Sequence, residues 1–217
     1  MLQRYCGGAR RMLEIGCGTG FVLNAIGGAF PQLELFGSEI ASAGLEFAKS
    51  RNPRATLFQM DARQIPYENE FDVIGAFDVL EHIDSDTQVA RAIFQALRPE
   101  GHAIISVPQH MFLWSELDRR AGHVRRYGVR ELERKLEAVG FAIEMKTSFL
   151  TVLLPALYLA RRVARSSAPG EPIAELHLPV AIDRVFGWTL ALERKMIDGG
   201  ARFPAGGSQL IVARRPG

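Results

Sequence analysis

The chain has 217 residues, of which 47% are hydrophobic and 23% charged, so its composition is that of a globular protein with a substantial core. The formal net charge of +2 is too small to indicate nucleic-acid binding by itself, and two cysteines are too few for a disulfide framework. The N-terminus has no signal-peptide pattern, and no apolar run reaches the roughly 18 residues of a membrane span. We therefore expect one cytoplasmic domain, residues 1–217.

Strand and helix patterns alternate along the chain, which predicts an α/β protein whose parallel sheet is covered by helices on both faces. The strands are expected at residues 12–16, 33–37, 55–59, 71–77, 102–107, 141–148 and 208–214. The helices between them are expected at 20–28, 42–50, 85–97 and 129–139.

Residues 149–206 interrupt this alternation, and such an insertion can close the substrate side of a site. Its first part, 149–160, is almost all apolar, and a second helix is expected from about Pro179 to Ile197. One interpretation of the apolar run is a helix buried against the sheet. The other is a face for a membrane surface or a lipid-like substrate, because Arg161, Arg162 and Arg165 follow it directly.

The stretch Leu13–Gly20 reads as a buried strand that runs into a glycine-rich turn, with a helix directly behind it. Glycine at 16, 18 and 20 permits positive φ and a close approach of the backbone to a ligand, and the helix N-terminus offers free N–H groups. The spacing Glu-x-Gly-x-Gly-x-Gly differs from the dinucleotide fingerprint, whose last glycine comes three residues after the second. The alternative is a tight turn without a ligand.

Two acids indicate the kind of ligand. Glu39 ends the second predicted strand, where a carboxylate can accept both hydroxyls of a ribose. Glu14 lies inside the glycine motif and suits a ligand with a cation near its sugar better than a pyrophosphate. S-adenosylmethionine, with its sulfonium and α-ammonium groups, is such a ligand. For Glu39 the alternative is a charge that merely suits the helix dipole.

In these features the chain resembles the class I S-adenosylmethionine-dependent methyltransferases, in particular the type 11/12-like small-molecule subgroup. The resemblance covers residues 11–148, including the segments 59–62, 71–83 and 97–107, and returns at 207–215. It implies a doubly wound, mostly parallel seven-stranded sheet of the Rossmann-like methyltransferase fold, with an antiparallel last strand and a helical insertion before it. The implied cofactor is S-adenosylmethionine and the implied product S-adenosylhomocysteine. Cofactor binding needs no metal, and the sequence shows no cluster of metal ligands.

The resemblance also implies which residues contact the cofactor. Asp61 would bind the adenine amine and Glu14 the methionine ammonium, although a cap for the next turn is an alternative role for Asp61. The full set of implied cofactor contacts is Glu14, Gly16, Gly18, Gly20, Glu39, Asp61, Ala62, Phe77 and Asp78.

The loop after the fifth predicted strand combines aromatic and polar side chains and leaves the sheet beside the expected methyl group. Its Gly-His-Val-Arg-Arg-Tyr segment, 122–127, resembles an element of a bacterial methyltransferase subgroup. We expect His123 to be a general base, because histidine titrates near neutral pH. The expected substrate contacts are His110, Trp114, Arg126 and Tyr127. Alternatively, Arg125, Arg126 and Tyr127 staple the loop to the next helix, and the pair Glu81–His82 is either an acid–base pair or a structural helix start.

Together these features predict methyl transfer to a small-molecule acceptor, with O-methylation of a lipid-linked acceptor favoured and a peripheral membrane contact through 149–165. A nucleic-acid substrate is not expected, since the Asn/Asp-Pro-Pro-Tyr element is absent. One alternative is a non-enzymatic cofactor-binding protein or partner subunit, because only about ten residues precede the first strand where the family usually has one or two helices. The other is an NAD(P)-dependent oxidoreductase, which the glycine spacing disfavours. The oligomeric state is left open.

Overall fold

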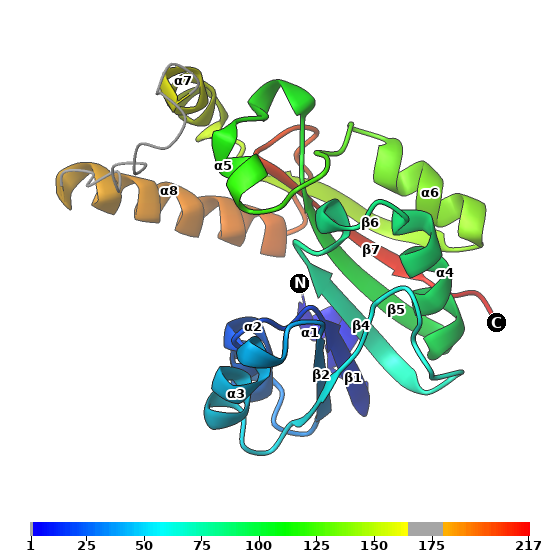
Figure 1. Ribbon diagram of the computed structural model, residues 1–217. Coiled ribbons are helices and arrows are strands. Elements are labelled where there is room, and N and C mark those ends of the chain that lie inside the picture. Colours follow the sequence, from blue (N-terminus) through cyan, green and yellow to red (C-terminus); the bar gives the residue numbers. More distant parts are fainter. Residues whose placement is uncertain (1, 165–179) are drawn as a thin grey trace.

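A computed structural model describes residues 2–164 and 180–217. Seven strands form one sheet in the order β3-β2-β1-β4-β5-β7-β6 (Figure 1). Their bounds are β1 Arg11–Ile15, β2 Glu34–Glu39, β3 Thr56–Gln59, β4 Phe71–Phe77, β5 Leu97–Pro108, β6 Ala142–Phe149 and β7 Ser208–Arg214. The strands from β3 to β5 pair in parallel, whereas β7 is antiparallel to both β5 and β6. The expected methyltransferase-type sheet with its antiparallel last strand is therefore confirmed.

The helices lie around this sheet as the alternating pattern predicts. They are α1 Leu2–Cys6, α2 Phe21–Ala29, α3 Ser42–Arg51, α4 Asp86–Ala96, α5 Glu116–Arg120, α6 Glu131–Val139, α7 Leu154–Ala164 and α8 Val180–Asp198, with short 3-10 turns η1 Leu80–His82 and η2 Met111–Leu113. Figure 1 shows α4 and α6 side by side over one face of the sheet, and α7 and α8 beyond one end of it.

Successive residues of the central strands enter two different cores, because side chains alternate across a strand. Ile74 and Ile105 pack in the core under α4 and α6, whereas Val73 and Ile104 pack in the core on the α1 and α2 side. Burial on both faces explains why these strands are continuously apolar in the sequence. The loops at the carboxyl ends of the strands therefore extend from a sheet that is packed on both faces.

Two segments differ from the sequence-based expectation. Strand β5 begins at Leu97, five residues before the expected start, because Phe71 pairs with Leu97 beyond a register shift. The loop after β5 contains η2 and α5, neither of which was expected. Helix α5 forms because Ser115 and Asp118 make a capping box, in which the N–H of Ser115 donates to Asp118 Oδ2 at 2.8 Å.

The insertion before β7 contains two helices, as expected. Helix α7 starts at Leu154, so Pro155 falls in its first turn, where a missing N–H costs no intrahelical bond. Tyr158 of α7 meets Phe112 of η2, with ring centroids 6.0 Å apart, and Glu193 of α8 accepts hydrogen bonds from the backbone after β6. Arg165 and Pro179 lie outside the described residues. None of the helices in the described ranges is long and apolar enough to cross a membrane.

Candidate active site

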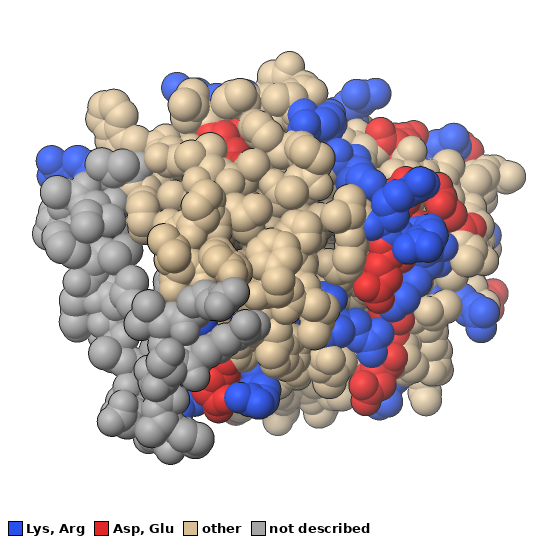
Figure 2. Space-filling view, turned by 90° about the horizontal axis from the view of Figure 1, so that it is seen from above, with Lys and Arg blue, Asp and Glu red and all other residues tan. Residues whose placement is uncertain are grey.

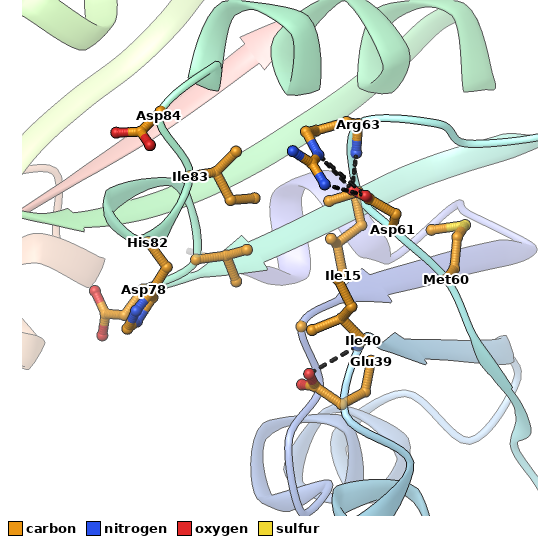
Figure 3. Close-up of a pocket in the computed structure, with 13 residues that line it drawn as sticks. Ile15, Glu39, Ile40, Met60, Asp61, Arg63, Asp78, His82, Ile83 and Asp84 are labelled. Atoms are coloured by element: carbon orange, nitrogen blue, oxygen red, sulfur yellow. Dashed lines mark hydrogen bonds and ion pairs between the residues drawn. The ribbon is translucent and has the colours of Figure 1, made fainter. Parts of the chain in front are cut away.

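A cavity of about 590 Å³ opens at the carboxyl ends of β1, β2 and β4, where the strand order reverses (Figure 3). Ligands of open α/β sheets bind at this kind of crevice. Five of the residues for which cofactor contacts are expected line it, namely Gly16, Glu39, Asp61, Ala62 and Asp78. The topology thus brings together positions that are more than sixty residues apart in the chain.

The glycine loop has the backbone conformation that its sequence predicts. The φ angles of Gly16, Gly18 and Gly20 are 65°, 51° and 78°, all in the left-handed region that favours glycine. A side chain at Gly16 would lie 2.5 Å from the Val79 side chain, and one at Gly20 would lie 2.4 Å from that of Asn52. The space beside Gly18 holds no atom within 4 Å in the described structure. Packing therefore requires glycine at 16 and 20, whereas Gly18 leaves the backbone open to a ligand.

The carboxylate of Glu39 is held at the cavity wall by backbone donors. The Gly18 N–H donates to Oε2 at 3.0 Å, and those of Ile40 and Ala41 donate to Oε1 at 2.8 and 3.2 Å. These bonds connect the glycine loop to the end of β2. They place a fixed acceptor beside the open face of Gly18, where the hydroxyls of a ribose are expected.

Glu14 is a buried acid, with 2% of its surface exposed, beside the cavity residues Ile15 and Gly16. Its Oε2 has no hydrogen-bond partner among the residues described. Burial raises the pKa of this carboxyl from 4.5 to about 8. A buried acceptor without a partner, next to the cavity, is the arrangement that the ammonium group of S-adenosylmethionine would satisfy.

The remaining expected cofactor contacts have different surroundings. Arg63 binds Asp61 through Nε and Nη2, with a shortest distance of 2.6 Å, and these hydrogen bonds hold the pKa of Asp61 below its usual range (Figure 3). Asp78 has a positive φ of 54° and accepts a hydrogen bond from Ser106 at 3.3 Å, while burial raises its pKa. Phe77 packs in the core on the α1 side of the sheet rather than along the cavity.

In the loop after β5, the side chains of two arginines and a histidine meet at Asp118, which is 1% exposed. Oδ1 accepts from Arg126 Nε at 2.8 Å and from His123 Nδ1 at 3.2 Å, and Oδ2 accepts from Arg161 of α7 at 2.8 Å. Burial alone would raise the pKa of Asp118, but the bonds and charge of Arg126, the Ser115 N–H and the charge of Arg161 together outweigh it, and the pKa is lowered. Arg161 thus joins the insertion to this loop instead of extending into solvent.

His123 is half-buried at the edge of this cluster. Burial, followed by the neighbouring His82, lowers its pKa, although Asp118 opposes this shift. The two imidazole rings meet edge to face with centroids 4.7 Å apart, and His82 lines the cofactor cavity. The geometry therefore places the expected base next to the cavity, with Nε2 free of hydrogen bonds among the described residues.

The other expected substrate residues make contacts within the protein. The Tyr127 hydroxyl, fully buried, donates to Asp86 Oδ2 at 2.8 Å, and Arg125 and Lys135 bind the same oxygen. These contacts attach the loop to α4, which precedes it, and the shared Asp86 also binds Lys135 of the following helix α6. The expected stapling to the following helix is therefore present only indirectly, through Asp86. His110 stacks on Phe112, with ring centroids 4.8 Å apart, and its buried Nε2 has no partner in the described ranges. Trp114 is half-buried.

Sequence reasoning did not anticipate the surroundings of Glu81. This side chain is fully buried, and neither of its carboxylate oxygens has a hydrogen-bond partner among the residues that the structure describes. His123 lies beside it, with its Nε2 4.0 Å from Glu81 Oε1. The sequence drew attention to the pair Glu81–His82. A single 3-10 turn is too short to have a periodic pattern, so the sequence does not show whether Glu81 is buried.

Comparison with known proteins assigns the family. A family model described as a methyltransferase domain matches residues 2–146. A probable S-adenosylmethionine-dependent methyltransferase of Mycolicibacterium smegmatis is 29% identical over 146 residues, which are 66% of this chain and 56% of that protein. The malonyl-[acyl-carrier protein] O-methyltransferase of Bacillus cereus is 28% identical over 102 residues, which are 46% of this chain and 38% of that protein. The chain thus spans about half the length of the curated relatives it matches, or less.

A solved structure shows the shared fold. The S-adenosylmethionine dependent methyltransferase from Mesorhizobium loti superposes with a TM-score of 0.63 at 20% identity, covering 97% of this chain and 93% of that one. The doubly wound sheet, with its crevice beside the glycine loop, defines the Rossmann-like class I fold. With the family match over residues 2–146, the chain belongs to the S-adenosylmethionine-dependent methyltransferases.

Proposed function

We propose that this protein transfers a methyl group from S-adenosylmethionine to an oxygen atom of a small-molecule acceptor. One observation carries the proposal: a single cavity extends from Glu39 and the glycine loop, on one side, to Asp78 and His82 on the other. The first side fits the sugar of a nucleoside, and the second lies beside the loop that would hold an acceptor.

The residues of the cavity suit the parts of the cofactor. Glu39 would accept the ribose hydroxyls, Glu14 would receive the ammonium, and Asp61 would bind the adenine amine. The apolar side chains of Ile40 and Met60 line the cavity and would flank the adenine ring. When bound, the cofactor supplies an electrophilic methyl group on a positively charged sulfur.

On the acceptor side, the protein would contribute to catalysis by positioning the nucleophile. Holding a nucleophile in line with the methyl carbon can lower the barrier by several kcal/mol, of the order of 7–11 for well-oriented pairs. His110, Trp114 and Arg126 are proposed to shape this side, with Tyr127 fixing the loop from beneath. His123 would accept the proton of a hydroxyl acceptor through Nε2, because its lowered pKa keeps the ring neutral near pH 7.

An apolar, lipid-linked acceptor is the second part of the proposal. Three large apolar side chains of the insertion are mostly exposed, namely Leu159 of α7 at 64% and Trp188 and Leu192 of α8 at 76% and 60%. The face in Figure 2 has a broad area without charged side chains beside a region where both signs are interspersed. We propose that segment 149–165, whose last residue lies outside the described ranges, contacts a membrane surface peripherally. Binding of the protein to sedimented lipid vesicles, and its loss in Leu159→Glu, tests this contact.

The methyl-transfer proposal is tested with a panel of hydroxyl and carboxylate acceptors, some with an alkyl chain. S-adenosylhomocysteine formation and the methylated product are measured by mass spectrometry. Glu39→Ala should abolish product formation, whereas Glu34→Ala, an exposed acid of the same strand, should retain it. If the chain binds the cofactor but no acceptor yields product, the non-enzymatic alternative replaces this proposal.

A further inference from the structure

Three side chains converge at the wall of the cavity, and the proposed methyl transfer assigns a chemical role to only one of them, His123. Ligand atoms of Glu81, His82 and His123 all lie within 4.8 Å of one another. Glu81 and His82 come from η1, directly after β4, and His123 comes from the loop after α5. Ligands of one ion at about 2.1 Å are roughly 3.4 Å apart, so small rotations of these side chains are enough to place them around one ion.

Glu81 has the surroundings of a ligand rather than of a structural acid. It is fully buried, yet both of its carboxylate oxygens lack a hydrogen-bond partner in the described part of the chain. A buried polar group without a partner costs free energy, so structural acids are normally hydrogen-bonded. The buried acid Asp118 differs from Glu81 in this respect, because both of its carboxylate oxygens accept hydrogen bonds.

Both histidines are oriented by a bond from Nδ1. The Nδ1–H of His123 donates to Asp118 Oδ1 and that of His82 donates to the Gly122 carbonyl, each at 3.2 Å. Since carboxylate and carbonyl oxygens only accept, these bonds select the tautomer that leaves Nε2 with a lone pair. Metal-binding histidines commonly show this arrangement, with the second nitrogen held by a carboxylate or a backbone carbonyl.

We propose that Glu81, His82 and His123 bind a divalent first-row transition metal ion at the edge of the cofactor cavity. Two imidazoles and one carboxylate suit ions from manganese to zinc rather than magnesium or calcium, which prefer sets made of oxygen. Three protein ligands leave positions open, as in catalytic rather than structural sites.

The position of the site gives the ion a role. His82 lines the same cavity as Glu39, so an ion bound there would lie at the edge of the space in which the acceptor is proposed to bind. A metal ion there would hold and polarise an oxygen of the acceptor as a Lewis acid. His123 would then be a ligand rather than the proton acceptor. This role rests on the proposed function, whereas metal binding itself does not.

The test is a titration of the full chain, free of any purification tag, with Co²⁺. The wild-type protein should bind one equivalent and develop the visible absorption bands of Co²⁺ held by protein ligands. His82→Gln, His123→Gln and Glu81→Gln should each lower the affinity at least about 100-fold, because loss of an outer partner alone costs about 10–100-fold. The matched control is His102→Gln, which removes a histidine bound to Glu144 on the sheet and should bind Co²⁺ as the wild type does.

The outcomes separate the two proposals. Absence of Co²⁺ binding, or equal binding by the wild type and all three variants, would overturn the metal site. Binding of S-adenosylhomocysteine, measured calorimetrically on the same protein, reports the cofactor site independently. If Glu81→Gln does not fold by circular dichroism, the exposed His82 still decides the question, because its replacement removes no core packing.

Discussion

The imidazole of His123 is hydrogen-bonded through Nδ1 to the Oδ1 of Asp118, 3.2 Å away, in a loop whose own conformation depends on that carboxylate. Asp118 closes the capping box of α5 and pairs with Arg126 and with Arg161 of α7. One buried acid therefore orients the histidine beside the cavity, and also attaches the insertion to the loop after β5.

Replacing Asp118 with asparagine should destabilise the protein by about 3–5 kcal/mol, because the buried Arg126 would lose its charged partner. Urea denaturation measures the change. The matched control is Glu116→Gln on the same helix, whose pairs with Arg119 and Arg120 are exposed and should contribute about 0–1 kcal/mol. Similar losses for the two variants would contradict the role given to Asp118.

Tyr127→Phe should cost about 1.5 kcal/mol, the lower end for a hydrogen bond to a charged group, since Asp86 keeps Arg125 and Lys135. Thermal denaturation detects the loss. Tyr67→Phe is the control, because the Tyr67 hydroxyl makes no hydrogen bond within the described residues, and the stability of this variant should change little. If Tyr127→Phe kept full stability and lost acceptor binding, Tyr127 would contact the substrate directly.

The glycines of the loop should respond differently to alanine. Gly16→Ala should mainly destabilise the fold, because the new methyl would meet Val79 at 2.5 Å. The methyl of Gly18→Ala would have no atom of the described residues within 4 Å. This substitution should cost only about 1–2 kcal/mol for its left-handed backbone, while it weakens S-adenosylhomocysteine binding. Denaturation midpoints and calorimetry on both variants distinguish the two effects. The reverse ranking would show that Gly18, not Gly16, is the packed position.

Glu14 should make stability depend on pH. Its pKa is raised from 4.5 to about 8 on folding. Between these two pH values the folded protein retains a proton that the unfolded chain has released. The stabilising contribution of the protonated acid is complete below pH 4.5 and is lost as the pH rises through 8. The stability of Glu14→Gln relative to the wild type should therefore increase over this range.

Urea midpoints of the wild type and Glu14→Gln across the pH range give this difference directly. Glu34→Gln, which changes an exposed acid on β2, should follow the wild-type curve. A constant difference between Glu14→Gln and the wild type would mean that Glu14 is already ionised in the folded protein.

Local patterns in the sequence were enough for most of the sheet. The strand expected at 71–77 has those bounds in β4, and the last strand expected at 208–214 is β7. Buried strands are apolar on both faces and are bounded by turn residues, so their signal is local. The expected start of β5, the strand after β4, was five residues too late. A proline such as Pro99 can follow the end of a helix or lie at the edge of a sheet, so it did not distinguish the two.

The acceptor side could be predicted only in part. The segment 122–127 identified the loop, but the contacts of Tyr127 with Asp86 span 41 residues and depend on how α4 and α6 pack. The proximity of Glu81 and His123 also depends on distant contacts, since it requires that α5 forms and that Asp118 binds Arg161 of α7. No local pattern specifies such distant contacts, which is why the sequence showed no set of metal ligands.

The central claim, that the glycine loop and Glu39 form a site for S-adenosylmethionine, is tested most directly by calorimetric titration with S-adenosylhomocysteine. The intact chain and Glu39→Ala are compared, with NAD as the control ligand. Micromolar binding by the intact chain, strongly weakened in the variant and not seen with NAD, is the expected result. Equal binding by the two proteins, or tighter binding of NAD, would contradict the assignment of this cavity.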